Sequence, residues 1–181
     1  MNTIIKILLI AYIVLSSISC ADDKPNETGT NQYFSITPLY DTESKLIDSY
    51  KSDYKIFVYV YFTLNDCQPC AEELILWNDI KNTFGNEAIV YGITNEKKKA
   101  ILTRYINMLG INYPVLIDSN ASIRGKNNIQ ITPARIITNA SKKIIYRSDA
   151  SDREYRFMSI VDSIELFLKN EQLSAHLNNK N

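Results

Sequence analysis

Two cysteines separated by two residues are the part of this sequence best suited to chemistry. They lie in the segment D-C-Q-P-C-A-E-E, residues 66–73, directly after a strongly apolar run. A thiolate is the nucleophile in disulfide exchange, but a free cysteine, with a pKa of about 8.5, is mostly protonated at neutral pH. If the pair opens a helix, unpaired N–H groups and the positive end of the helix dipole stabilise an anionic sulfur. We therefore expect Cys67 to be the exposed attacking thiol and Cys70 the resolving thiol.

Three neighbouring residues complete the predicted active-site loop. Pro69 has no N–H to donate and fits the first turn of a helix, so it stiffens the loop that it shares with Gln68 without breaking the helix. Asp66 adds a negative charge beside Cys67, which tends to raise a thiol pKa, while the helix start lowers it. The sequence leaves that balance open.

A carboxylate one helical turn after the second cysteine is a candidate for proton transfer. Glu73 is close enough along the helix to relay a proton to or from Cys70, provided that it is buried. The alternative is a solvated helix carboxylate, an interpretation that fits Glu72 better.

Zinc binding and a structural bridge are the main alternatives for the cysteine pair. A structural zinc site needs four ligands and a catalytic one usually three plus water. Beyond the pair, the chain offers only Cys20, which belongs to an N-terminal signal, and His176, in a polar tail. We predict no metal site, and no cofactor beyond the redox-active disulfide. An extracytoplasmic compartment permits a structural disulfide, but so small a loop gives little stabilisation in the chain-entropy model.

Strands and helices alternate in the first half of the predicted domain. The β-branched and aromatic run at 55–63 predicts a buried central strand, and 69–84 has the apolar spacing of a helix. A second strand is predicted at 88–94. Asn95 is a candidate N-cap for a second helix, which ends at Gly110. The apolar side of this helix carries Ile101, Tyr105, Met108 and Leu109.

The second half of the domain predicts a hairpin and a terminal helix. A short strand is expected at 114–118, and a short helix with a loop at 119–128. The hairpin strands are 134–138 and 143–147, joined by a turn that begins with asparagine. A capping box, S-x-x-E, is formed by Ser151 and Glu154 and opens the last helix. Its core-facing stripe contains Phe157, Ile160, Val161, Ile164 and Leu168.

This order resembles the thioredoxin fold, an α/β fold with a central mixed β-sheet flanked by helices. The motifs C-Q-P-C-A-E-E, P-V-L-I-D and I-T-P-A are similar to those of membrane-tethered thiol–disulfide oxidoreductases of the TlpA type. The resemblance implies that Glu73 is a buried acid near the active site and that Pro133 is a cis-proline facing the cysteines. It also implies that the backbone of Thr132 pairs with an extended substrate segment. Asp66 departs from the family pattern, which has tryptophan there.

Two other functions fit a thioredoxin-like fold. A thiol peroxidase is one, although peroxiredoxins have a threonine three residues before the nucleophile, where Leu64 stands here. The other is a non-catalytic binding module whose cysteines are locked as a bridge.

The N-terminus has the layout of a secretory signal. Lys6 precedes a short apolar stretch, residues 7–15, which is too short for a typical transmembrane helix. Small residues then lead to Cys20, which resembles the lipidated cysteine of bacterial lipoproteins, with Ser17 in place of the usual leucine. We expect a protein of the bacterial cell envelope, lipid-anchored to a membrane through Cys20 and facing the periplasm or the cell surface.

Four segments follow from these patterns. Residues 1–19 are the predicted lipoprotein signal peptide, 20–33 the lipidated cysteine with a flexible tether, 34–172 the thioredoxin-like domain and 173–181 a polar tail. Twenty basic and twenty acidic residues cancel, which argues against a nucleic-acid partner. The expected partners are extracytoplasmic proteins with cysteines and a membrane or thioredoxin-like electron donor.

Overall fold

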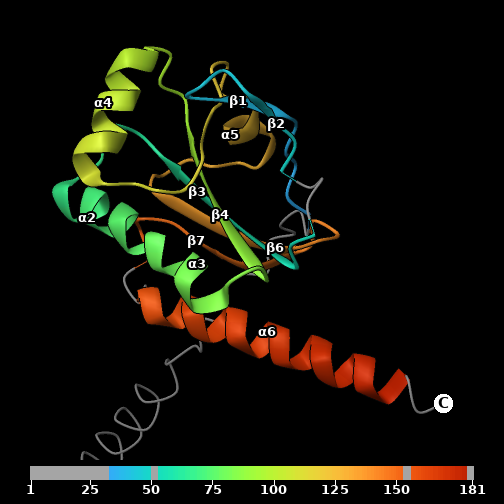
Figure 1. Ribbon diagram of the computed structural model, residues 1–181. Coiled ribbons are helices and arrows are strands. Elements are labelled where there is room, and N and C mark those ends of the chain that lie inside the picture. Colours follow the sequence, from blue (N-terminus) through green and yellow to red (C-terminus); the bar gives the residue numbers. More distant parts are fainter. Residues whose placement is uncertain (1–32, 50–52, 153–155, 179–181) are drawn as a thin grey trace, which may run out of the picture. The chain divides into compact units, whose positions relative to one another are not determined.

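A mixed β-sheet organises the chain in the computed structural model, which describes residues 33–49, 53–152 and 156–178 (Figure 1). The strands are β1 (Leu39–Asp41), β2 (Leu46–Ile47), β3 (Ile56–Phe62), β4 (Ala88–Thr94), β5 (Val115–Ile117), β6 (Ala134–Asn139) and β7 (Ile144–Ser148). The helices are α2 (Gln68–Leu76), α3 (Asn78–Phe84), α4 (Lys99–Leu109), α5 (Ser122–Lys126) and α6 (Phe157–Asn178).

The seven strands lie in the order β2-β1-β5-β4-β3-β6-β7. The β3, β4 and β5 strands are parallel, whereas β6 runs antiparallel to β3, and β7 antiparallel to β6. This mixed sheet flanked by helices confirms the predicted fold class. Because the active-site helix α2 directly follows β3, its N-terminus lies at the carboxyl end of the central strand.

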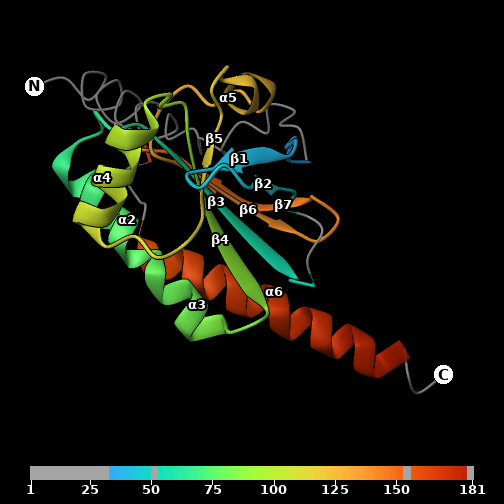
Figure 2. The ribbon, with the colours of Figure 1, turned by 45° about the horizontal axis from the view of Figure 1, so that its top comes forward.

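Alternate side chains of β3 build the two faces of the core. Ile56, Val58, Val60 and Phe62 belong to a cluster that also contains buried residues of α2, α4 and α6. The intervening side chains belong to a second cluster with buried residues near α5. Figures 1 and 2 show α5 on the opposite side of the sheet from α6. Burial on both faces explains the continuous apolar run that predicted this strand.

The helix predicted at 69–84 is divided in two. Trp77 separates α2 from α3, and the Ile80 N–H donates to Trp77 O, three residues back, at 3.4 Å. This tighter turn is typical of a short 3₁₀ step between helical segments. The predicted end of the segment is correct, since Gly85 follows α3 with a positive φ of 57°.

The helix α4 starts later than predicted and packs differently. Its N-cap is Lys98, so the prediction of Asn95 as N-cap was wrong, whereas Gly110 ends the helix in the left-handed conformation as expected. Ile101 and Met108 were predicted on the packed side but are 48% and 70% exposed. Leu102 is the buried residue of the helix, while Tyr105 and Leu109 of the predicted side pack partly buried against the core.

The terminal helix also begins later than its predicted capping box. It starts at Phe157, while Ser151 lies in the preceding turn and donates its hydroxyl to Asp149 Oδ1 at 2.5 Å. Glu154 lies outside the described residues. The stripe reaches the core through Ile160, Ile164 and Leu168, whereas Phe157 and Val161 are partly buried against it.

An N-terminal hairpin, formed by β1 and β2, was not predicted. Its strands have three and two residues, too few for an alternating pattern. The Asp41 carboxylate closes the turn by accepting from the N–H groups of Glu43 and Lys45 at 2.8 and 2.9 Å. The predicted signal peptide, residues 1–19, lies outside the described residues. The boundary at 172 stays a prediction, and α6 continues past it to Asn178.

Candidate active site

Cys67 and Cys70 form a disulfide at the N-terminus of α2. Their Sγ atoms are 2.07 Å apart and their Cα atoms 5.1 Å apart. Cys67 is the N-cap, and its carbonyl accepts the first helical hydrogen bond, from the Ala71 N–H at 3.0 Å. Cys67 is exposed and Cys70 is partly buried. The cysteine predicted to attack is therefore the more accessible of the two.

The two residues between the cysteines are exposed. Gln68 Nε2 donates to Glu72 Oε1 at 3.1 Å, and Pro69 lies in the first turn of α2. The first N–H groups of a helix have no intrahelical partners, so this turn carries the positive end of the dipole. Pro69 fits here because its missing N–H would have had no helical acceptor.

The Asp66 carboxylate joins two loops beside the disulfide. Its Oδ2 accepts from the Thr63 N–H at 2.9 Å, and its Oδ1 accepts from the Thr63 hydroxyl at 2.6 Å. The same Oδ1 accepts from the Thr132 hydroxyl at 2.7 Å, across 66 residues of sequence. Asp66 thus connects the end of β3 with the segment before β6.

The Thr132–Pro133 peptide bond is cis. Pro133 is buried and Thr132 is partly buried. On one side of this bond Thr132 is tied to Asp66, the residue before Cys67. On the other side, two residues after Pro133, Arg135 pairs with a residue of α2. These two contacts connect the cis-proline segment to the residue before Cys67 and to the helix α2.

Glu73 is buried and forms an ion pair with Arg135. Arg135 Nε donates to Glu73 Oε1 at 2.6 Å, and Arg135 Nη2 donates to Glu73 Oε2. The two residues are 8% and 3% exposed. A bidentate pair of this kind is the strong geometry for a guanidinium and a carboxylate. Glu72 is exposed, so the solvated carboxylate is Glu72 and the buried one is Glu73.

Two aromatic side chains complete the surroundings of this ion pair. Trp77 Nε1 donates to Glu73 Oε1 at 3.2 Å. The Tyr113 hydroxyl donates to Leu74 O at 2.9 Å, and burial, followed by the negative charge of Glu73, raises the pKa of Tyr113. Tyr113 is therefore a neutral hydrogen-bond donor at physiological pH.

A cavity of about 550 Å³ opens beside the disulfide. Both cysteines and both members of the buried ion pair line it, together with the loop after β7. From that loop come Asp149, Ala150 and Asp152. The cavity therefore gives access to both cysteines and to the buried ion pair.

Sequence reasoning missed Arg135, Thr63 and Trp77 as parts of this site. Arg135 had a usable signal, because it is the only charged residue in the predicted strand at 134–138. An arginine in a buried strand is almost always paired. The partnership of Thr63 and Thr132 with Asp66 had no such signal, since threonine is common in strands.

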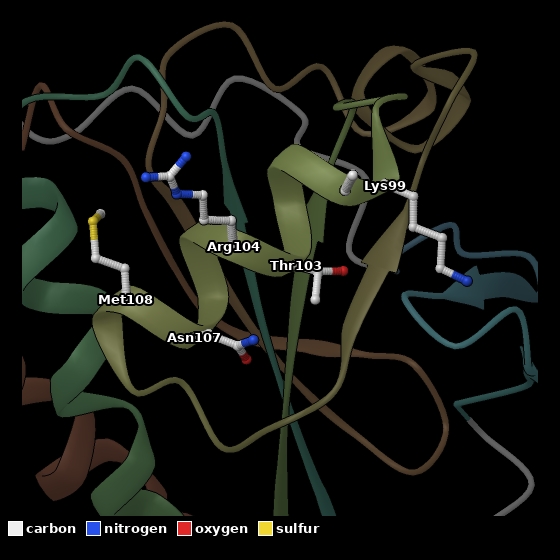
Figure 3. Close-up of a pocket in the computed structure, with 6 residues that line it drawn as sticks. Lys99, Thr103, Arg104, Asn107 and Met108 are labelled. Carbon is white, nitrogen blue, oxygen red and sulfur yellow. The ribbon is translucent and has the colours of Figure 1, made fainter.

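Another hollow lies on the outer face of α4 (Figure 3). Lys99, Thr103, Arg104, Asn107 and Met108 project from this one helix, and none of the residues lining the hollow is a cysteine. It lies on a single helix, apart from the disulfide. Across the part of the chain that the structure describes, no three His, Cys, Asp or Glu side chains are grouped to hold a metal ion.

Fold and site together define a protein of the thioredoxin fold with a Cys67–Cys70 disulfide at a helix N-terminus. The chain belongs to the AhpC/TSA family, whose model matches residues 28–147. No curated protein matches the chain in sequence.

Solved structures similar to this one support the fold. The thioredoxin domain of a thiol-disulfide oxidoreductase from Bacteroides vulgatus is 15% identical, with a TM-score of 0.64 over 76% of this chain and 96% of that one. A secreted Mycobacterium tuberculosis disulfide oxidoreductase is 13% identical, with a TM-score of 0.61 over 72% and 95%. The peroxidoxin BcpB from M. tuberculosis is 12% identical, with a TM-score of 0.56 over 67% and 86%.

Proposed function

We propose that the protein is a membrane-anchored extracytoplasmic oxidoreductase that reduces disulfides of exported proteins. The observation that carries this proposal is the disulfide at a helix N-terminus, with Cys67 exposed and Cys70 less so. The helix start supplies the stabilisation that a Cys67 thiolate needs after reduction.

The proposed cycle conserves two electrons and two protons. The Cys67 thiolate attacks one sulfur of the substrate disulfide, a mixed disulfide forms, and the other substrate sulfur leaves as a thiolate that takes up a proton. Cys70 then loses its proton and attacks Cys67 Sγ. The Cys67–Cys70 bond forms, and the second substrate sulfur leaves and is protonated. A membrane or thioredoxin-like donor must return two electrons and two protons before the next turnover.

Glu73 is the proposed acceptor of the Cys70 proton. It lies one turn after Cys70, and both residues line the same cavity. Each oxygen of Glu73 accepts a hydrogen bond from Arg135. Before Glu73 can take up a proton, one of these two hydrogen bonds must break. The proposed relay therefore requires the Arg135 guanidinium to move.

Cys20 carries the proposed membrane anchor. It lies outside the described residues, and its role rests on the signal-like sequence before it. Across residues 33–49, 53–152 and 156–178, the structure contains no helix that is both long and apolar enough to span a bilayer. Acyl chains contribute about 0.8 kcal/mol per buried methylene, so more than one chain would give firm attachment.

Trapping of mixed disulfides tests the proposed function. Cys70→Ser should accumulate a covalent adduct with protein substrates through Cys67, because no thiol remains to resolve it. Cys67→Ser should trap none. Both variants would be incubated with disulfide-bonded exported proteins and analysed by non-reducing electrophoresis and mass spectrometry. Equal trapping by the two variants would refute the assigned roles, and a disulfide that neither glutathione nor a thioredoxin reduces would favour the binding module.

A thiol peroxidase is the second candidate, favoured by the AhpC/TSA match and by the similarity in fold to a peroxidoxin. In that reaction a Cys67 thiolate attacks the terminal oxygen of a hydroperoxide, the O–O bond breaks, and the alcohol leaves after protonation. The resulting sulfenic acid condenses with the Cys70 thiol to a disulfide and water. Leu64 counts against it, since its partly buried apolar side chain has no hydroxyl. Oxidation of Cys67 by peroxide much faster than that of a free thiol would establish it.

A further inference from the structure

The Asp66 carboxylate accepts three hydrogen bonds, two from Thr63 and one from Thr132. A carboxylate that only faced solvent, or only changed the pKa of Cys67, would need none of them. Asp66 N–H donates to Thr63 O at 3.3 Å, while the carboxylate accepts from the Thr63 N–H and hydroxyl. The turn 63–66 is thus closed from both ends. A third bond, from the Thr132 hydroxyl, fastens the segment before Pro133 to this closed turn.

Thr132 lies where the sheet pairing of β6 has not yet begun. The first paired residue is Ala134, opposite Tyr61. Neither the N–H nor the C=O of Thr132 makes a hydrogen bond to another residue that the structure describes. Those two groups are therefore available to an extended chain added at this position.

We propose that Asp66 is a positioning residue that fixes the main chain of Thr132 for docking of an extended polypeptide next to Cys67. The inference rests on the proposed oxidoreductase function and adds a positioning residue to it. The substrate is a protein segment whose disulfide lies in an extended stretch, since a small disulfide has no main chain to pair with Thr132.

The chemistry of the contact requires a carboxylate on one side and a hydroxyl on the other. An ionised carboxylate is acceptor-only, so both oxygens of Asp66 suit the three donors. In Asp66→Asn the amide nitrogen cannot accept, so one acceptor position is lost. In Thr132→Val the hydroxyl is lost and the shape is kept, whereas Thr132→Ser keeps the donor.

Two probes with the same leaving group separate docking from thiol chemistry. One is an extended peptide with a single cysteine joined by a disulfide to thionitrobenzoate. The other is the small symmetric disulfide of thionitrobenzoate. Attack by Cys67 of the reduced full chain releases the same chromophore from both. The measured quantity is the ratio of kcat/KM for the peptide to kcat/KM for the small disulfide.

We expect Thr132→Val to lower this ratio about tenfold, through KM, because a hydrogen bond to a charged group is lost from the element that docks the peptide. Thr132→Ser should restore most of it. Asp66→Asn should lower the ratio as well, and the double variant should fall no further than the larger single effect, because both changes break one contact. Thr103→Val makes the same chemical change on the exposed outer face of α4 and should leave the ratio at the wild-type value (Figure 3).

Two results would overturn the inference. One is a Thr132→Val ratio equal to that of the wild type, and the other is an equal loss for both probes, which would assign the contact to thiol chemistry. In both cases the wild type still reduces the probes, so the proposed function stands. If the reduced wild type attacks neither probe, the proposed function fails, and the inference fails with it.

Discussion

Two carboxylates flank the same disulfide, and their surroundings differ. Asp66 is partly buried and accepts from Thr63 and Thr132, whereas Glu73 is buried and paired with Arg135. Where a carboxylate is partly exposed, water can replace a hydroxyl as its hydrogen-bond donor, so losing such a bond costs little free energy. A buried charge without its counter-charge is costly. The comparison indicates that the Asp66 contacts contribute little stability and suit substrate docking. The Glu73–Arg135 ion pair instead neutralises a charge in the core, so breaking it costs stability.

The largest expected difference concerns stability. Arg135→Met leaves Glu73 as an uncompensated buried charge and should lower the free energy of unfolding by about 3–5 kcal/mol. Asp66→Asn should lower it by about 1 kcal/mol. Urea unfolding, followed by fluorescence of the single tryptophan, Trp77, measures both. Trp77 is fully buried and packs against Phe157 at a centroid distance of 5.0 Å, so its emission reports the core.

A double variant separates the effect of the unpaired Glu73 charge from that of losing the arginine side chain. Glu73→Gln combined with Arg135→Met removes both charges and should recover part of the loss seen with Arg135→Met alone. If Arg135→Met costs no more than Asp66→Asn, the distinction between the two carboxylates is wrong.

A smaller effect is expected on the pKa of Tyr105, a tyrosine affected by the charge of Asp66. Burial, followed by the negative charge of Asp66, raises the pKa of Tyr105. Asp66→Asn should therefore lower this pKa, without bringing it to the ordinary value of about 10, because burial remains. NMR titration of ring-labelled tyrosine measures it, with Tyr105→Phe to assign the signal. An unchanged pKa in Asp66→Asn would show that the carboxylate does not act on Tyr105.

The sign for stability follows from the direction of this shift. A phenol whose pKa is raised in the folded state contributes stability that is fully present below the unfolded pKa of about 10. That contribution is lost as the pH rises through the folded pKa. The stability of Asp66→Asn should therefore fall less than that of the wild type in alkaline solution.

Local patterns predicted those parts of the fold that depend on near neighbours in sequence. The run at 55–63 identified β3 because burial on both faces demands continuous apolar residues, and Gly110 marked a helix end because its positive φ of 66° favours glycine. Helix starts were less predictable. Asn95 is a good N-cap by type, yet the N-cap of α4 is Lys98, three residues later, although β4 already ends at Thr94.

The residues of the candidate site also fall into a group that the sequence predicted and a group that it did not. The cysteine pair and the buried Glu73 follow from spacing along one helix, and the resemblance to TlpA-type proteins supplied Thr132 and Pro133. The contacts with Asp66 and Arg135 join residues 66 and 62 positions apart. Such pairings depend on how β6 lies beside β3, which no local pattern specifies.

Alkylation of the reduced protein tests the central claim most directly. The claim is that Cys67 is the nucleophile because it is exposed at a helix N-terminus, with Cys70 behind it. Brief treatment with iodoacetamide near neutral pH, followed by tandem mass spectrometry of the peptide that contains both cysteines, gives the order of modification. We predict that Cys67 is alkylated first. Modification of Cys70 first, or of both at equal rates, would contradict this account.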